Sequence, residues 1–396
     1  MLELKDKTQC CGCASCAQAC PKHCITMQAD DEGFLYPQID QEQCIHCGLC
    51  EASCPVLNVQ PEAEGRPLAY AAYSKNEEQR QRSSSGGIFS LLAEQTLNAG
   101  GVVIGAEMAE DCRSVQHVAI ESKDELYRLQ GSKYLQSQIG TTYAQAKQYL
   151  AEGRKVLFSG TPCQIEGLKA YLKKDDVNLL CVDLICHGAP SPKLWAKYVA
   201  DCEKRAGAQV QRTFFRHKKY GWKTYAVLLE FSNNTAYEQM LQKDLYMQMF
   251  LQNLCLRPSC YQCQFKKMHR VSDITLADFW GCQSVCPEMD DDKGLSAVML
   301  HSEKGQKAID ALQDQAVWKQ VDIEQVVAGN PSMVKSCEKP PMRDAFMQAM
   351  DGMPIQKLGK KYLKRVPMKT RVIEKMKAMI PSNMKAILKK ILRRNI

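Results

Sequence analysis

The residues whose chemistry is easiest to define are eight cysteines near the start of the chain. They fall into two copies of one spacing, C-x-x-C-x-x-C-x-x-x-C, and a proline follows each copy. The two copies are Cys10, Cys13, Cys16 and Cys20, and then Cys44, Cys47, Cys50 and Cys54. Thiolates at this spacing can bind the iron corners of a 4Fe-4S cubane, which accepts and releases single electrons. The sequence therefore predicts electron transfer.

The same spacing occurs in bacterial two-cluster ferredoxins, where the fourth cysteine of each copy binds the other cluster. We therefore predict two 4Fe-4S clusters with crossed ligands. The first set is Cys10, Cys13, Cys16 and Cys54, and the second set is Cys44, Cys47, Cys50 and Cys20. Disulfides and zinc are weaker interpretations, because disulfides need an oxidising compartment and zinc sites usually pair two C-x-x-C units. Cys11 and Cys24 fall outside the register, and we interpret them as spare thiols.

The composition indicates a soluble globular protein of two or three domains, since the 396 residues are 45% hydrophobic and 24% charged. No apolar run reaches the ~18 residues of a membrane-spanning helix. Residues 1–7 are charged and lack the apolar core of a signal peptide. The chain has 21 cysteines, many at cluster spacing, which indicates a reducing compartment at low oxygen. We therefore expect a cytoplasmic protein.

The charge is uneven along the chain. Residues 355–396 carry fourteen Lys or Arg against Glu374 alone, so this tail has a net charge of +13, whereas the whole chain has +8 and residues 1–354 sum to −5. Helical spacing relates the apolar tail residues Met384, Ile387, Leu388, Ile391 and Leu392. We expect a basic amphipathic helix that contacts the anionic inner face of the cell membrane, or else a solvated or subunit-packing helix. Nucleic acid is a poorer partner, because no aromatic residues interleave with the charges.

Beyond residues 1–59, which form the cysteine module, and a linker at 60–67, the patterns predict alternating strands and helices. We expect strands at 101–106, 155–159, 179–186 and 225–231. We expect helices at 142–151, 164–174, 192–204 and 239–252. This alternation predicts an α/β domain with a partly parallel sheet. We divide it into parts 68–150 and 151–345, followed by the basic helical tail at 346–396.

Two segments of the α/β domain could bind ligands. Residues 83–87 (SSSGG) precede a helix expected over 88–96 and could cradle a phosphate, although a simple helix cap is the stronger interpretation of this segment alone. Residues 158–163 (FSGTPC) predict a strand, a turn and a helix start. This places Cys163 at a helix N-terminus, where thiolate is favoured, as a nucleophile, a metal ligand or a structural cysteine.

More cysteines follow at other strand and loop ends. Cys186 ends the next expected strand, and parallel strands would bring it to the same sheet edge as Cys163. Cys260 and Cys263 form a C-x-x-C that is a redox disulfide, half of a zinc site, or part of a four-thiolate set with Cys163 and Cys186. Cys255, five residues before Cys260, is the alternative candidate for one ligand of this four-thiolate set.

Two acidic segments complete the motifs of the α/β domain. In residues 273–281 (DITLADFWG), Asp278 lies in an apolar run and needs a partner, for which we expect Arg270. We expect Asp290, Asp291 and Asp292 to form an exposed acidic loop.

The order of these segments resembles one family over about residues 5–340. The segments are SSSGG, GGVVIGA, LQGSKYLQS, FSGTPCQIEGL, LICHG, RPSCYQC and DITLADFWG. They resemble the beta-subunit family of deazaflavin (coenzyme F-420) hydrogenases and formate dehydrogenases, in a bacterial branch with an N-terminal two-cluster ferredoxin domain. The resemblance implies an α+β ferredoxin-like module followed by an α/β flavin-binding domain.

The resemblance also implies site residues. A third 4Fe-4S cluster beside FAD would use Cys163, Cys186, Cys260 and Cys263. The positions that match family segments around FAD are Ser84, Ser85, Gly86, Gly87, Gly131, Ser132, Lys133, Gly160 and Thr161. Lys133 or Arg257 would stabilise negative charge on reduced flavin or on substrate.

The implied function is an iron–sulfur flavoprotein oxidoreductase that passes electrons between ferredoxin and FAD. The FAD would then exchange hydride with a small organic molecule. The DFWG ending and the fused module are typical of bacterial members encoded near surface-polysaccharide genes, many of which are not expected to make the deazaflavin. The organic substrate is therefore either deazaflavin-like or from such a pathway. The alternative is an electron-transfer subunit of a larger dehydrogenase or hydrogenase, with no substrate site of its own.

Overall fold

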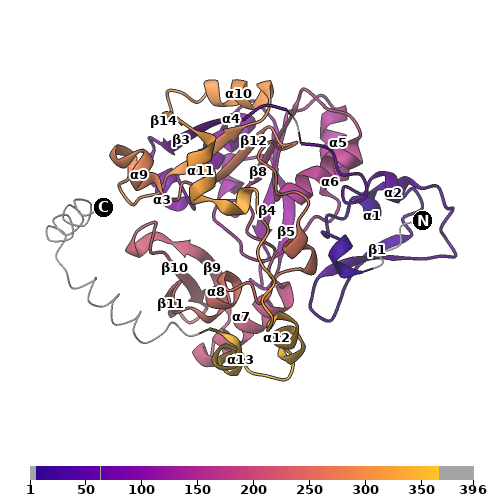
Figure 1. The fold of residues 1–396 in the computed structure, drawn as a ribbon, viewed down its shortest axis with the longest axis vertical. Coiled ribbons are helices and arrows are strands. Elements are labelled where there is room, and N and C mark those ends of the chain that lie inside the picture. The colour runs from indigo at the N-terminus through magenta and orange to yellow at the C-terminus, as the bar shows by residue number, and fades with distance from the viewer. Residues whose placement is uncertain (1–5, 63, 365–396) are drawn as a thin grey trace, which may run out of the picture.

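The structure is a computed structural model that describes residues 6–62 and 64–364. It begins with a small α+β module at the right of Figure 1. The elements of this module are η1 (Lys7–Gln9), α1 (Ser15–Ala19), β1 (Ile25–Ala29), β2 (Leu35–Ile39) and α2 (Leu49–Ala52). Strands β1 and β2 form an antiparallel hairpin. Each short helix follows a residue in the left-handed region, Ala14 or Gly48, so the two cysteine loops have the same local design.

The largest element of the body is a nine-stranded sheet in the order β14-β3-β13-β12-β8-β7-β4-β5-β6. Its strands are β3 (Leu68–Ser74), β4 (Val102–Met108), β5 (Val115–Ile120), β6 (Ser137–Gln138), β7 (Val156–Gly160), β8 (Leu179–Leu184), β12 (Ile274–Asp278), β13 (Ser296–Leu300) and β14 (Ala316–Val321). The central strands β4, β7, β8 and β12 are parallel, and antiparallel strands flank them. The prediction of a partly parallel sheet is therefore confirmed.

The sheet is buried on both faces, as the apolar runs of its central strands require. Along β4, Val103 faces one side, and Val102 and Ile104 face the other. Helices α4 (Ile88–Asn98) and α10 (Glu303–Asp310) cover the first side, and α5 (Thr142–Ala151) and α6 (Pro162–Leu172) cover the second. Helix α11 (Ile323–Gly329) packs elsewhere on the sheet with α9 (Cys282–Val285), and α3 (Glu77–Arg82) precedes α4.

A second, three-stranded antiparallel sheet lies below the large sheet in Figure 1. Its strands are β9 (Val210–His217), β10 (Ala226–Phe231) and β11 (Ala236–Met240). It packs in one aromatic core with the helices α7 (Pro192–Ala206), α8 (Leu245–Leu251), α12 (Arg343–Ala349) and α13 (Ile355–Tyr362). Trp195, Phe215 and Tyr246 are fully or nearly fully buried there.

Two sequence-based boundaries change in the structure. The helix expected over 239–252 is wrong in its first half, because Gln239 and Met240 belong to β11 and the helix begins only at Leu245, capped by the Asp244 side chain. The tail that we placed from residue 346 begins with two packed helices, since Phe346 and Leu358 are fully buried. Residues 365–396, which carry the expected amphipathic helix, lie outside the described residues. Among the residues that are described, no helix combines the length and apolarity that a membrane span requires.

Candidate functional site

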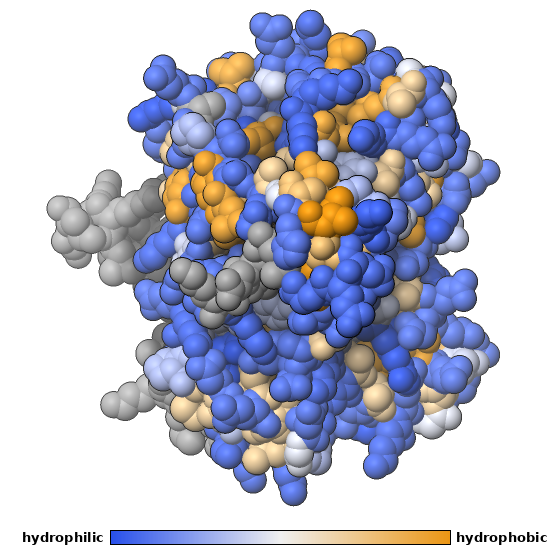
Figure 2. Space-filling model, turned by 90° about the vertical axis from the view of Figure 1, so that its right-hand side faces the viewer, coloured by the Kyte–Doolittle hydropathy of each residue, from blue (hydrophilic) through white to orange (hydrophobic). Residues whose placement is uncertain are grey.

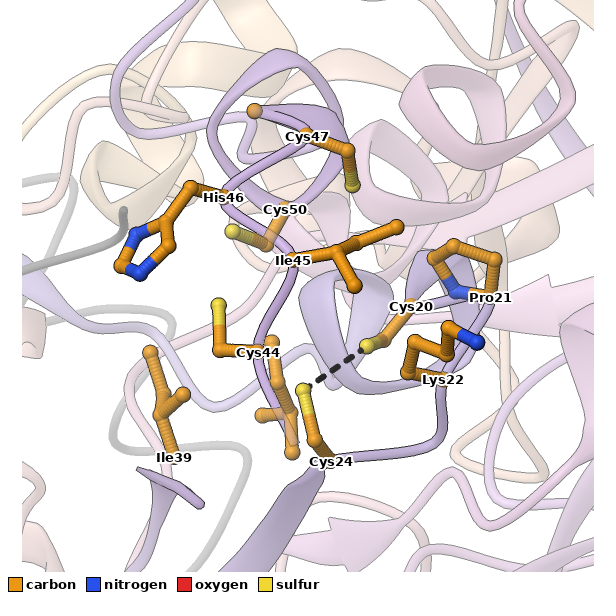
Figure 3. A pocket seen from close by; sticks show the side chains of 12 residues that line it. Cys20, Pro21, Lys22, Cys24, Ile39, Cys44, Ile45, His46, Cys47 and Cys50 are labelled. Atoms are coloured by element: carbon orange, nitrogen blue, oxygen red, sulfur yellow. Dashed lines mark hydrogen bonds between the residues drawn. The ribbon is translucent and has the colours of Figure 1, made fainter. Parts of the chain in front are cut away.

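The cysteines of the second set surround one small cavity of about 20 Å³ in the module. Figure 3 shows their side chains arranged around a common hollow, contributed by the end of α1, the residue before β1, the loop before α2 and α2 itself. The lining cysteines are Cys20, Cys24, Cys44, Cys47 and Cys50. Cys24, which we interpreted as a spare thiol, lies with its Sγ 3.3 Å from the Sγ of Cys20. The cavity therefore has five thiols where the spacing predicts four ligands.

The first set converges beside the second. The pKa of Cys16 is raised to about 12, because the thiol is buried and because Cys10 and Cys54 lie close enough to repel its thiolate. Repulsion from Cys10 and Cys16 likewise acts to raise the pKa of the buried Cys13 thiol. The fold thus brings Cys54 of the second copy to the first three cysteines of the first copy, as crossed ligation requires.

The third set forms at the carboxyl edge of the large sheet. Cys163 lies in the first turn of α6, where the Thr161 and Gln164 side chains form a capping box and Pro162 occupies the first helical position. Cys186 follows β8, which is the parallel neighbour of β7. Cys260 belongs to the 3-10 helix η4 (Pro258–Gln262).

The thiols of the third set lie close to one another. Burial raises the pKa of Cys260, and repulsion from Cys186, Cys263 and Cys163 adds to the increase. The backbone N–H of Ala189 donates to Cys260 Sγ at 3.3 Å. The structure thus brings these four thiols together, and the positive charge of iron bound there would offset the repulsion between four thiolates.

The rival ligand Cys255 lies apart from this set. Its thiol is fully buried in the aromatic core, which raises its pKa. The charged group that shifts this pKa is Arg343 rather than another cysteine. Cys337, to which we gave no role, lies beside the set instead, since its Sγ donates to the His187 carbonyl at 2.7 Å. No group of three or more His, Cys, Asp or Glu among the described residues has single-ion geometry. A cubane does not require that geometry, because each thiolate binds a different iron.

The module packs directly on the elements that carry the third set. A Cβ added to Gly167 of α6 would lie 2.9 Å from Cys13 Cβ and 3.0 Å from Cys13 Sγ, so this helix position admits only glycine without a shift. The Cys11 thiol hydrogen-bonds with both Cys13 and Cys163. Cys11, another residue that we interpreted as spare, thus links the first set to the third.

Arg257 has a different position from the one that we expected. It is fully buried, and its guanidinium donates to the Cys10 carbonyl at 2.7 Å, the Leu35 carbonyl at 2.9 Å and Gln136 Oε1 at 2.9 Å. Nε and Nη2 therefore fasten the body to the module, and Nη1 donates to Gln136 of the body, rather than facing a substrate.

The three segments that match the family around FAD lie near one another. Ser132 Oγ donates to Ser84 Oγ at 2.8 Å, which joins the loop 131–133 to the loop 83–87. Burial lowers the pKa of Lys133 to about 8. The Lys133 charge also acts on His117, whose Nε2 lies 3.0 Å from the Ser159 carbonyl, beside Gly160 and Thr161.

The loop 83–87 is held tightly against the sheet. Ser85 Oγ donates to the Leu295 carbonyl at 2.8 Å, and the Gly86 N–H donates to Ser296 Oγ at 3.0 Å. A Cβ on Gly86 would lie 2.3 Å from the Ala72 carbonyl oxygen, so the glycine is required by close packing. Gly87, the N-cap of α4, has φ +90°, a conformation that also favours glycine.

The prediction that Arg270 pairs with Asp278 is wrong. Asp278, at the carboxyl end of β12, pairs with Arg216 and accepts from Trp222 Nε1 at 2.8 Å, whereas Arg270 is already paired with Asp183 at 3.3 Å. The partner of Asp278 comes from the small sheet, which the sequence pattern did not place opposite it.

The acidic segment 290–292 is a loop, as we expected, but only Asp291 is exposed, and its carboxylates are paired. Asp291 accepts two hydrogen bonds from Arg80, at 2.7 and 2.8 Å, and Asp290 pairs with Lys223 at 2.6 Å. These partners come from α3 and from the segment between β9 and β10, which approach the loop only in the folded chain.

A larger open cavity, of about 520 Å³, lies on the module side of η4. Its charged side chains are largely paired with one another. Arg343 donates to Glu32 at 2.5 Å, and Lys339 donates to Asp344 at 2.7 Å. The charges at this cavity therefore hold the module, α12 and the preceding loop together.

Comparisons with known proteins agree along most of the chain. Residues 9–58 match the 4Fe-4S dicluster domain, and two further segments match the beta subunit of coenzyme F420 hydrogenase/dehydrogenase, residues 69–142 its N-terminal part and residues 153–326 its C-terminal part. Among solved structures, a chain of the xenon-derivatized F420-reducing [NiFe] hydrogenase complex from Methanosarcina barkeri is 16% identical, with a TM-score of 0.45. That match covers 76% of this chain and 94% of the other. No curated protein matches the chain.

Proposed function

Because this chain belongs to the coenzyme F420 hydrogenase/dehydrogenase beta-subunit family and carries a 4Fe-4S dicluster domain, we propose that it is an iron–sulfur flavoprotein oxidoreductase. It would pass electrons between a one-electron partner such as ferredoxin and FAD. The observation that carries the proposal is the contact of Cys13 with Gly167, which sets the first cysteine set against the helix that has Cys163 in its first turn.

The proposed route through the protein follows the contacts between thiols. Repulsion from Cys50 of the second set contributes to the raised pKa of Cys16 of the first set, so the two sets of the module adjoin. Cys11 then connects Cys13 to Cys163. The buried guanidinium of Arg257 fixes this junction through the Cys10 carbonyl. A module held in this way keeps its distance to the body constant, which suits electron transfer between fixed centres.

The proposed FAD site uses the loops 83–87 and 131–133 and the turn at Gly160. FAD would connect one-electron clusters to two-electron hydride chemistry on an organic substrate. The Ser84 and Ser132 hydroxyls and the backbone N–H groups around Gly87 can donate to phosphate oxygens. Lys133, half-buried with a lowered pKa, would add a positive charge beside them.

Metal and flavin analysis of protein purified without oxygen tests this proposal. Three cubanes beside one flavin give about twelve irons per flavin, because each cubane holds four irons. Cys163→Ala should remove about four of them and leave the module clusters intact. Cys255→Ala is the matched control, since Cys255 is also buried but lies apart from the set. Iron lost equally in both variants, or a protein without flavin, would contradict the proposal.

A role as one subunit of a larger complex is the second candidate, favoured because the matched family is one of beta subunits. In that case the chain would relay electrons within the complex and have no substrate site of its own. Ile45 and Leu57 on the module expose 55% and 58% of their surfaces, and Figure 2 shows apolar side chains gathered near the middle of this side. Flavin turnover by the isolated chain with reduced ferredoxin and an organic acceptor would exclude the pure relay.

A truncation of the chain tests the proposed membrane contact of the basic tail. Since α13 is packed through Leu358 and Tyr362, the chain should be cut after Lys364 rather than within the packed helices. Sedimentation with anionic vesicles should then fall for the truncated chain. Equal sedimentation of both chains would remove the membrane from the proposal.

A further inference from the structure

Arg216 joins the two sheets of the body. It lies on β9 of the small sheet, and its Nη1 donates to Asp278 at the carboxyl end of β12 in the large sheet. Only 4% of its side chain is exposed. Trp222 Nε1 donates to the other Asp278 oxygen at 2.8 Å, so the carboxylate is held from both sides and fixes the orientation of the guanidinium.

The other two nitrogens of this guanidinium are not used. Nε and Nη2 of Arg216 are buried, and neither has a hydrogen-bond partner among the residues that the structure describes. Since Nη1 is occupied by Asp278, these two atoms form the remaining side-on edge of the guanidinium, which presents two parallel N–H bonds. Buried charged donors without acceptors are costly, so this edge indicates a ligand with two adjacent acceptor atoms.

The surroundings of Arg216 favour a flat ligand. The guanidinium carbon lies 4.4 Å from the ring centroid of Tyr225 and 5.5 Å from that of Trp280. Trp280 is itself stacked on Trp222, with ring centroids 4.8 Å apart and planes within 4°. Aromatic rings beside a guanidinium with two free N–H donors suit a planar heterocycle with carbonyl groups better than a flexible chain.

The same corner is continuous with the proposed FAD loops. Tyr134, which follows Lys133 directly, hydrogen-bonds with Tyr225. Lys218, two residues after Arg216, is buried and donates to the Ser85 carbonyl at 2.9 Å and to the carbonyls of Arg80 and Lys293 at 2.8 Å. The end of β9 therefore holds the 83–87 loop through Lys218.

We propose that Arg216 binds the pyrimidine edge of the flavin ring, donating from Nε and Nη2 to the ring N1 and the C2 carbonyl. Negative charge gathers at that edge when the ring is reduced, so the contact favours the reduced flavin over the oxidised flavin. This inference rests on the proposed function, and it adds a binding residue that the sequence motifs did not indicate. Asp278 acts as a positioning residue, because it touches Arg216 and not the ring.

The test compares variants of the full chain purified without oxygen. Arg216→Met removes the fork and the charge, and Arg216→Lys keeps a charge that can pair with Asp278 but not the two-donor edge. Arg212→Met is the matched control, since Arg212 lies on the same strand with 67% of its side chain exposed. The readouts are the flavin content, the iron content as a measure of folding, and the flavin midpoint potential from absorbance titration.

We expect Arg216→Met to weaken binding of reduced flavin relative to oxidised flavin by roughly tenfold, a fall of about 30 mV for a two-electron couple. The midpoint potential of Arg216→Lys should lie between those of this variant and the wild type. The Lys variant provides the test if the Met variant does not fold. Arg212→Met should keep the wild-type potential.

Three results would overturn the proposal. An unchanged potential in flavin-containing Arg216 variants would remove Arg216 from the flavin site but leave the proposed function standing. A rise in KM for the organic substrate at constant potential would assign the fork to the substrate instead. A wild-type protein without flavin would overturn the proposed function itself, and this inference with it.

Discussion

The cysteine module and the α/β body bring thiols together in opposite ways. In the module, Cys10, Cys13 and Cys16 lie on one short loop, so their spacing alone brings them together. In the body, Cys163 and Cys186 meet because β7 and β8 are parallel neighbours, and Cys260 joins them from the distant segment η4. Local spacing therefore defines one kind of site, and sheet topology defines the other.

This contrast has a consequence for mutations. Changes at the module cysteines should alter cluster content while leaving the body folded. Changes in the body should also alter the stability of the fold, because its site residues are held by the same ion pairs and helices that support the sheet. Matched variants in the two regions can therefore separate loss of a cluster from loss of the fold.

The largest effect is expected in the module. Cys16→Ala should remove the first cluster and reduce flavin reduction by ferredoxin to background, because the proposed route enters through this set. Cys24→Ala is the control, and it should keep its iron if the spacing alone defines the ligands. A loss of about four irons in Cys24→Ala would show that the thiol 3.3 Å from Cys20 is a ligand after all.

In the body, the buried pair of Asp183 and Arg270 should matter for stability. Their side chains are 2% and 3% exposed. Asp183→Asn leaves a buried charge without its partner and should lower the free energy of unfolding by about 3 kcal/mol. Asp310→Asn, at an exposed position on α10, should change it little. Urea unfolding measures both variants, and equal midpoints would contradict this account.

The junction between the two regions should respond to Gly167→Ala. The added methyl group would meet Cys13 Cβ at 2.9 Å and should cost about 1–3 kcal/mol of stability through overpacking. It should also slow electron transfer from the module to the flavin by widening the junction. Gly352→Ala, which meets no atom within 4 Å, is the control. Stopped-flow reduction of the flavin that is as fast in Gly167→Ala as in the control would show that the module does not transfer electrons here.

A smaller effect concerns pH. Burial lowers the folded-state pKa of His117 to about 4, below its ordinary value of 6.5. Between these values the unfolded chain binds a proton that the folded chain does not, so stability falls as the pH falls through this window. His117 should contribute about 1 kcal/mol of lost stability between pH 7 and pH 5.5. His117→Gln should lack this part of the pH dependence in urea unfolding, and His217→Gln should keep it.

The sequence could predict the features that depend on local spacing. The two cysteine loops, the Pro162 helix start and the buried central strands follow from patterns of a few residues. Even the convergence of Cys163 and Cys186 followed from the parallel order of two neighbouring strands. These features need no knowledge of distant contacts.

Other features depend on how the two sheets meet, and the sequence could not supply that. Arg216 of the small sheet, not Arg270, pairs with Asp278. Gln239 and Met240, which we expected at the start of a helix, belong to an edge strand paired with β10. Arg257 lies beside the C-x-x-C in sequence, but its contacts are set by the docking of the module.

The position of Arg257 also limits how this protein can be taken apart or rebuilt. A fused electron carrier is often treated as a portable part that can be cut off or exchanged between proteins. Here, removing residues 1–59 would strand a fully buried guanidinium whose acceptors include the carbonyls of Cys10 and Leu35. A chimera with a foreign carrier would have to offer carbonyl oxygens at the same two points. The module and the body are therefore one structural unit. An insertion or a module exchange at residues 60–67 succeeds only if both sides of this junction are redesigned together.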